Sequence, residues 1–154
     1  MIQLTATHVP NPEKYLPQYK TEGAACADMV ACIPPNIVDT VDIGTQIKLG
    51  FRSIVTINCG FKLAIPDGYK FSFAIRSSLA QKGIMLMNHP QIDSDYRGEV
   101  KAVLANFSHS FITIEDGERF AQCWIEPIFK PDWSIVENLP STTRGEGGFG
   151  STND

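Results

Sequence analysis

The last eleven residues combine chemical groups that suit the binding of a phosphorylated nucleotide. Arg144 leads a glycine-rich stretch that contains Phe149 and Gly150, and Ser151 and Thr152 follow. Glycine lets backbone N–H groups approach an anion closely, and arginine can donate two hydrogen bonds to one phosphate. An aromatic ring beside such donors offers a face on which a nucleobase can stack. The stretch therefore indicates a nucleotide site, with a disordered chain end as the alternative.

A second group of phosphate-binding side chains lies in the middle of the chain. Arg76, Ser77 and Ser78 stand where a predicted strand meets a predicted helix over residues 78–82. We expect Ser77 or Ser78 to be the N-cap of this helix and Gly83 to end it. Arginine, hydroxyl groups and a helix N-terminus favour phosphate binding, and ordinary helix capping is the alternative.

Further polar groups are concentrated in three segments. Residues 92–99 read IDSDYRGE, which indicates either a turn with functional groups or a solvated hairpin tip. Arg119 and Gln122 lie at the start of a predicted strand, from which they could reach a ligand or face water. Asp28 is an acid in a small, apolar segment, and a carboxylate in such surroundings requires a polar partner.

The composition narrows the class of protein. A chain of 154 residues, with 43% hydrophobic and 19% charged residues, is expected to form one globular domain. Its net charge of −4 argues against non-specific binding to nucleic acid or to a membrane. The four cysteines form no CxxC pair and, with three scattered histidines, give no zinc signature. We expect free thiols and, since neither a signal peptide nor a spanning segment is recognisable, a cytoplasmic location.

Short β-rich runs recur between turn residues, and helical periodicity is almost absent. Strands are expected over 54–57, 61–65, 69–75, 100–107, 111–114 and 120–128, with Asp-Gly turns at 67–68 and 116–117. This spacing is typical of an all-β barrel or sandwich. We expect a β domain over residues 1–130, followed at 131–154 by a linker and a flexible, glycine-rich C-terminal arm.

In this order, the segments resemble the five motifs of the trimeric deoxyuridine triphosphate diphosphatases (dUTPases). They are AACAD at 24–28, RSSLA at 76–80, IDSDYRGE at 92–99, GERFAQ at 117–122 and RGEGGFGST at 144–152. The first motif departs from the family, because Cys26 replaces a usual glycine and Ala27 a usual aromatic residue. Ile75, before the second motif, replaces a usual proline or glycine. The last motif is the strongest single match.

The resemblance implies a jelly-roll-like β-barrel subunit with one short helix. Three such subunits would form a homotrimer with active sites between them, and the C-terminal arm would close over a site. The implied reaction is hydrolysis of dUTP to dUMP and pyrophosphate by attack of water on the α-phosphorus. Mg²⁺ bound to the triphosphate is the implied cofactor.

The resemblance also implies roles for residues of the central hairpin and the loop after it. Asp93 would hold and deprotonate the attacking water, a role in which geometry matters more than a large pKa shift. Tyr96 would pack against the deoxyribose and exclude a 2′-hydroxyl. Asn88 and the backbone near Gln91 and Ile92 would bind the uracil edge.

The remaining roles concern the phosphates. Side chains from three motifs would contact them: Arg76, Ser77, Ser78, Gln122, Arg144, Ser151 and Thr152. Asp28 would act near the hydrated magnesium ion. Phe149 would lie over the base, and the adjacent Gly150 would also contribute to substrate binding.

The hairpin sequence departs from the family, and it leaves alternatives open. Where family members of this type carry Asn-x-Pro-Gly-Thr-Ile-Asp, residues 88–93 read NHPQID, so one residue and the glycine are missing. The element that reads the base is therefore altered. One alternative is a trimer of the same fold that binds a nucleotide or a partner without catalysis. Another is a deoxycytidine triphosphate deaminase, although that enzyme needs a glutamate base in a different central motif.

Overall fold

The fold is built almost entirely from short antiparallel strands. A computed structural model describes residues 2–7, 11–33 and 45–147. Two small sheets pair β1 (Gln3–Ala6) with β5 (Phe61–Ala64) and β3 (Gln46–Leu49) with β10 (Ile112–Glu115). A four-stranded sheet has the order β2 (Ala27–Val30), β11 (Arg119–Pro127), β6 (Tyr69–Ile75), β8 (Gln91–Ile92). A three-stranded sheet has the order β4 (Ile54–Asn58), β9 (Lys101–Asn106), β7 (Ile84–Leu86).

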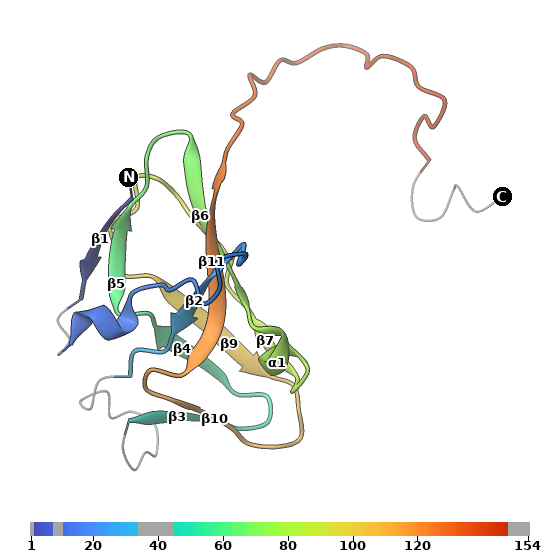
Figure 1. The fold of residues 1–154 in the computed structure, drawn as a ribbon. Helices are drawn as coiled ribbons and strands as arrows, with labels where there is room; N and C mark the ends of the chain where they lie inside the picture. The colour runs from blue at the N-terminus through green and yellow to red at the C-terminus, as the bar shows by residue number, and fades with distance from the viewer. Residues whose placement is uncertain (1, 8–10, 34–44, 148–154) are drawn as a thin grey trace.

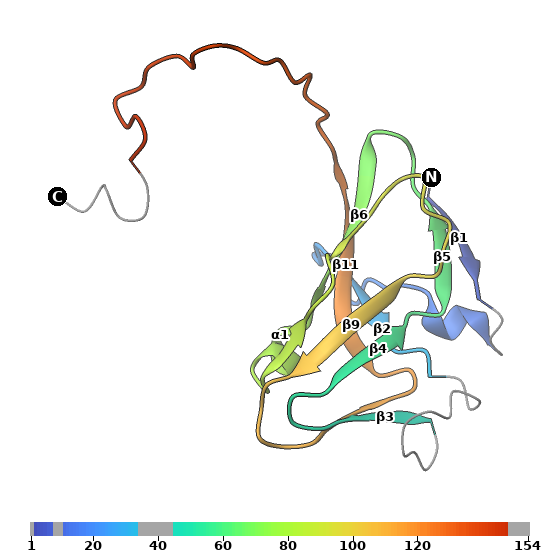
Figure 2. The ribbon, with the colours of Figure 1, turned by 180° about the vertical axis from the view of Figure 1, so that it is seen from behind.

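The two larger sheets face each other across the hydrophobic core. The three-stranded sheet lies behind β2 and β11 in Figure 1 and in front of them in the reverse view of Figure 2. Phe73 and Phe120 from one sheet, and Ile57 and Leu104 from the other, are fully buried in one apolar cluster. Burial of such side chains is the main favourable contribution to folding. The predicted all-β, jelly-roll-like barrel with one short helix is confirmed.

Inward and outward residues alternate in several strands, but β2, β6, β9 and β11 also bury consecutive residues, as β6 illustrates. Phe71 and Phe73 are buried in the core, and their rings form an aromatic pair with centroids 6.2 Å apart. Ser72 lies between them, yet only 2% of it is exposed. Its hydroxyl donates a hydrogen bond of 2.6 Å to the carboxylate of Glu126 on β11. The buried Ser72 hydroxyl therefore has a hydrogen-bond partner.

The α-helix, α1, spans Ser77–Ala80 and is shorter than expected. The predicted serine N-cap is wrong: Arg76 occupies that position in an extended conformation, and no side chain caps the helix. The prediction that Gly83 ends the segment agrees with its φ of 83°, a left-handed conformation that favours glycine. The other helix is a 3-10 turn, η1 (Pro12–Tyr15). Neither helix in the described ranges is long and apolar enough to cross a membrane.

Beyond β11 the chain leaves the barrel as an extended segment, visible at the top of Figure 1. Residues 129–146 are all exposed, and no helix or strand is formed between 128 and 147. Four large apolar side chains of this segment are 83–103% exposed: Phe129, Trp133, Ile135 and Leu139. The segment begins close to the expected boundary between residues 130 and 131.

The cysteines are free thiols, as expected. Cys32, Cys59 and Cys123 are buried, whereas Cys26 is half-buried. Burial, followed by the nearby charge of Asp116, raises the pKa of Cys32 to about 11. Burial raises the pKa of Cys123 to about 12. Such thiols stay protonated at neutral pH and are poor nucleophiles.

Candidate active site

The strand order brings Asp28 to the centre of a cluster of phosphate-binding residue types. In the antiparallel pairing of β2 with β11, Asp28 lies opposite Gln122. Asp28 is buried, and its two carboxylate oxygens accept hydrogen bonds from Arg119 at 2.8 Å and from Gln122 at 3.1 Å. Arg76 adds an ion pair, with its Nε 3.8 Å from Asp28 Oδ1. The partner that the sequence required for Asp28 is thus a set of three side chains.

The charge balance of this cluster keeps Asp28 ionised. Burial of the carboxyl group acts to raise its pKa. Hydrogen bonds from Arg119 and Gln122 and the charges of both arginines act in the opposite direction and prevail, so the pKa of Asp28 lies below its usual value. A carboxylate held in this way can orient the two arginines toward an anionic ligand.

Arg76, Ser77 and Ser78 lie together where β6 ends. Arg76 also donates a hydrogen bond from its Nη1 to the carbonyl oxygen of Arg119, at 3.3 Å. It therefore contacts both Asp28 and Arg119. Ser77 and Ser78 are exposed on the first turn of α1. Because α1 has only four residues, its dipole is small, so the predicted phosphate donors here are the side chains and not the helix terminus.

Asp116 fixes the turn that precedes β11 and thereby the position of Arg119. Its carboxylate accepts hydrogen bonds from the Tyr15 hydroxyl at 3.0 and 3.1 Å and from the backbone N–H of Ile33 at 2.8 Å. Lys14 forms an ion pair with the same carboxylate. Nothing in the sequence pattern pointed to Tyr15 or Lys14, because the contacts join residues about a hundred positions apart.

The predicted base-reading hairpin connects β7 with β8. The side-chain oxygen of Asn88 accepts a hydrogen bond of 2.8 Å from the backbone N–H of Val103, and its Nδ2 donates to the carbonyl oxygen of Lys101 at 3.2 Å. Asn88 therefore anchors the hairpin to β9. β8 pairs with β6, with Gln91 opposite Ser72. Gln91 is exposed, and Ile92 packs against the core.

Asp93 and Tyr96 lie in the loop that follows β8. The Asp93 side chain is exposed. The backbone carbonyl oxygen of Asp93 accepts a hydrogen bond of 3.2 Å from the backbone N–H of Tyr96. The Tyr96 ring packs over Gly98, where the Cβ of any other residue would overlap the Tyr96 hydroxyl. This hydroxyl donates a hydrogen bond of 3.2 Å to the backbone carbonyl oxygen of Glu99. Glu99 in turn accepts hydrogen bonds from Gly60 N–H and the Thr7 hydroxyl, at 3.1 and 3.2 Å. These contacts fix the loop that carries the predicted base.

The predicted site residues thus fall into two groups on one chain. Asp28, Arg76 and Gln122 are in direct contact, whereas Asp93 and Tyr96 belong to a separate loop. Among the described residues, no hydrogen bond or ion pair joins the two groups.

The predicted arm residues are described only in part. Arg144 is exposed, and its Nε donates to the carbonyl oxygen of Gly147 at 2.9 Å. The other predicted arm residues lie outside the described residues: Phe149, Gly150, Ser151 and Thr152.

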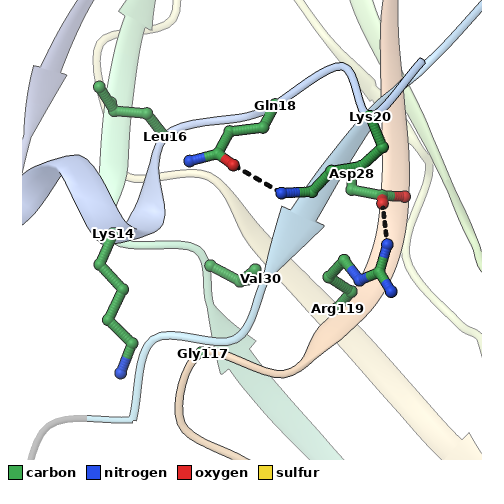
Figure 3. A pocket seen from close by; sticks show the side chains of 8 residues that line it. All are labelled: Lys14, Leu16, Gln18, Lys20, Asp28, Val30, Gly117 and Arg119. Carbon is green, nitrogen blue, oxygen red and sulfur yellow. Dashed lines mark hydrogen bonds and ion pairs between the residues drawn. The ribbon is translucent and has the colours of Figure 1, made fainter. Parts of the chain in front are cut away.

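A pocket of about 280 Å³ opens beside Asp28 (Figure 3). It lies between η1, the segment after it, β2 and the start of β11. Its walls are formed by Lys14, Leu16, Gln18, Lys20, Asp28, Val30, Gly117 and Arg119. The carboxylate of Asp28 and the guanidinium of Arg119 meet at its edge, as the dashed contact shows.

Comparison with known proteins connects this geometry with a family. A family model described as dUTPase matches residues 13–153, nearly the whole chain. This chain belongs to the dUTPase family. The deoxyuridine 5′-triphosphate nucleotidohydrolase of Desulfotalea psychrophila is 44% identical over 139 residues, which cover 89% of this chain and 86% of the relative. That of Ehrlichia canis is 36% identical over 156 residues, which cover 99% and 92%.

Solved dUTPase structures share the fold. A mutant dUTPase of Staphylococcus bacteriophage 80alpha, determined with dUpNHpp, has a TM-score of 0.78 at 21% identity, covering 99% of this chain and 98% of that chain. Native EIAV dUTPase has a TM-score of 0.68 at 20% identity, covering 91% and 100%. At these identities the likeness shows the fold alone.

Arg119 belongs to the Asp28 cluster of this dUTPase-family chain, although it is not among the site residues predicted from the sequence. Arg119 was noted only as a residue that could reach a ligand or face water. The requirement of Asp28 for a partner was the available signal, but the sequence has five arginines and does not show which of them meets it. In the structure, the register of β2 against β11 places Arg119 opposite Val30, two residues along from Asp28, and its guanidinium reaches the Asp28 carboxylate.

Proposed function

We propose that this protein hydrolyses dUTP to dUMP and pyrophosphate. A water oxygen attacks the α-phosphorus, the bond from this phosphorus to the bridging oxygen breaks, and pyrophosphate leaves with the bonding electron pair. The observation that carries the proposal is the dUTPase family match over residues 13–153. Relatives named deoxyuridine 5′-triphosphate nucleotidohydrolase, 36–44% identical over most of the chain, support it.

The proposed roles follow from what each side chain can do. Asp93 holds the attacking water and takes its proton; its exposed carboxylate lies in a loop that is fixed by the Tyr96 and Glu99 contacts. Phosphoryl transfer needs positioning and charge neutralisation more than covalent help from the protein. Arg76, Gln122, Ser77 and Ser78 contact phosphate oxygens in this proposal, and the contacts of Arg76 and Gln122 with Asp28 support it.

The proposed nucleoside contacts come from the hairpin and the arm. Tyr96 packs against the deoxyribose, and the backbone near Gln91 and Ile92 pairs with the uracil edge. Asn88 takes part by anchoring the hairpin, since its amide is already bonded to the backbone of β9. The arm closes over the nucleotide through Arg144 and residues 149–152. Closure expels water and strengthens the charged contacts.

We propose Mg²⁺ as the cofactor, held mainly by the triphosphate. In the described ranges, no group of three His, Cys, Asp or Glu side chains is arranged to hold a metal ion. Mg²⁺ keeps several waters and readily takes phosphate oxygens, so a site of this kind needs few protein ligands. Asp28 fits a contact through water, because each carboxylate oxygen can accept more than one hydrogen bond. The bound ion neutralises charge on the triphosphate. A dUTPase of phage phi11 of S. aureus coordinates a structural Mg(II) ion.

A homotrimer with active sites between subunits is the proposed assembly. Two features of the single chain support it. Within the described ranges, no hydrogen bond or ion pair joins the Asp93 loop to the Asp28 cluster, and the segment after β11 points away from the barrel (Figure 1). The exposed Phe129, Trp133 and Leu139 on this segment are large apolar groups of the kind that protein interfaces cover.

Pyrophosphate release from dUTP, dTTP, dCTP and the other deoxynucleotides, with and without Mg²⁺, tests the proposed function. Asp93→Asn keeps the shape of the side chain but removes the base. We expect it to slow dUTP turnover by roughly 100- to 10,000-fold with little change in binding. Asp67→Asn, an exposed acid in a turn of the barrel, is the matched control and should turn over normally. Wild-type rates in Asp93→Asn would exclude Asp93 as the base.

A further inference from the structure

The pocket beside Asp28 has an excess of positive charge that the proposed roles do not use. Lys14, Lys20 and Arg119 line it, and Asp28 is its acid (Figure 3). The charge of Asp28 is already compensated by Arg119 and, outside the pocket, by Arg76. The local excess of cations contrasts with the net charge of −4 on the whole chain. A positively charged hollow of this kind favours a small anion.

Lys20 is the cation most available to a ligand. Lys14 forms an ion pair with Asp116, and Arg119 with Asp28. Over the described ranges, Lys20 has no carboxylate within ion-pair distance, and its ammonium group donates only to the neutral side-chain oxygen of Gln18, at 2.7 Å. Both side chains lie on the pocket wall (Figure 3). An ammonium group held by a neutral acceptor keeps its full charge and two further N–H donors for an anion.

The pocket also adjoins the proposed phosphate contacts. Asp28 forms part of its wall through the same carboxylate that contacts Arg76 and Gln122. Asp28 therefore borders the pocket and also contacts two of the proposed phosphate-binding side chains. A volume of about 280 Å³ leaves room for an anion of two linked phosphate groups with some of its water.

We propose that this pocket binds inorganic pyrophosphate, with Lys20 and Arg119 as its main donors and Lys14 at its rim. The identification of this anion as the product of the reaction rests on the proposed function. After the bond to the α-phosphorus breaks, pyrophosphate moves past Asp28 into the pocket and leaves from there. Because charge-assisted hydrogen bonds hold it, its affinity falls as the salt concentration rises.

Titration calorimetry of the full-length protein with sodium pyrophosphate, without nucleotide or Mg²⁺, tests the site. Lys20→Gln should weaken pyrophosphate binding by about tenfold, the effect expected for one charge-assisted hydrogen bond. Lys20→Arg should restore most of the affinity, because it keeps the charge. Lys62→Gln, an exposed lysine on β5, is the matched control and should bind as the wild type does. Orthophosphate should bind more weakly than pyrophosphate.

A second measurement locates the anion. In amide NMR spectra, pyrophosphate should shift the resonances of Val30 and Gly117, which line the pocket. In Lys20→Gln, about tenfold more pyrophosphate should be needed to produce the same shifts. Unchanged affinity in Lys20→Gln, or shifts confined to residues outside the pocket, would overturn the proposal. The two proposals fail separately. If pyrophosphate binding depends on Lys20 but dUTP is not hydrolysed, the proposed function is wrong and the pyrophosphate site stands. If dUTP is hydrolysed but pyrophosphate binding does not depend on Lys20, the proposed function stands and the pyrophosphate site is wrong.

Discussion

At the scale of single residues, Asp28 shows how a buried charge can organise a site. An isolated carboxylate in an apolar segment is unfavourable, and this requirement for a partner was visible in the sequence. The structure meets it with Arg119, Gln122 and Arg76 at 2.8, 3.1 and 3.8 Å. The same contacts hold two guanidinium groups in fixed positions. We therefore expect the acid to serve both stability and the presentation of the proposed phosphate donors.

The lowered pKa of Asp28 predicts an acid-dependent loss of stability. A carboxyl group with a lower pKa in the folded state stabilises the protein above its unfolded pKa, and this contribution disappears as the pH falls below about 4. Asp28→Asn should lower the free energy of unfolding by about 1–3 kcal/mol at pH 7 and by much less at acidic pH. Urea unfolding at fixed protein concentration and several pH values measures this difference. An effect of Asp28→Asn that is the same at all pH values would contradict the assignment.

At the scale of elements, six strands were predicted from the sequence, and β1, β2, β3, β7 and β8 were missed. The six expected strands correspond to β4, β5, β6, β9, β10 and β11. Alternation over five or more residues, with Asp-Gly turns beside it, was sufficient for most of them. β8 has two residues and β7 three, and such segments show too little periodicity to identify. They become strands because β6 and β9 offer them free edges.

The same distinction applies to the candidate site. Motif residues could be found from type and order alone. Their mutual contacts depend on register, and so the roles of Arg119 in the cluster and of Asn88 as an anchor could not be predicted. Contacts such as that of Tyr15 with Asp116 join distant segments and leave no local pattern.

The altered hairpin predicts a specific pattern of base selectivity. Backbone hydrogen bonds to the uracil edge reject cytosine strongly, because mismatched polar groups would be buried without partners. A methyl group is excluded only by the position of the wall, which the missing residue changes. We expect dUTP to be the best substrate, dCTP to be strongly disfavoured, and discrimination against dTTP to be weakest. Comparison of kcat/KM for the three nucleotides measures this, and equal use of dCTP and dUTP would contradict it.

Asn88 offers a direct test of the hairpin's support. Asn88→Ala removes both hydrogen bonds to β9 and should lower kcat/KM for dUTP by about tenfold or more. His89→Ala, at the exposed neighbouring position, is the matched control and should have a much smaller effect. If the two variants behave alike, the anchoring role of Asn88 is wrong.

At the scale of the whole molecule, we expect the barrel and the segment after β11 to have separate roles. A chain ended at Thr143 retains every strand and should stay folded and trimeric, while losing most of its activity with Arg144 and the residues beyond it. Gel filtration and dUTP turnover measure both outcomes. Loss of the trimer on truncation would mean that residues 144–154 are needed for assembly. Trimers can also be mixed from Asp93→Asn subunits and subunits that end at Thr143. They should regain some activity if the arm of one subunit closes over a site whose Asp93 belongs to another subunit.

The central claim is water attack on the α-phosphorus of dUTP, and isotope labelling tests it most directly. The protein is supplied with dUTP and Mg²⁺ in ¹⁸O-labelled water, and the products are analysed by mass spectrometry. The account predicts one ¹⁸O atom in dUMP and none in pyrophosphate, because the attacking oxygen stays on the α-phosphorus. Label in pyrophosphate instead of dUMP, or recovery of the dUTP without hydrolysis, would contradict it.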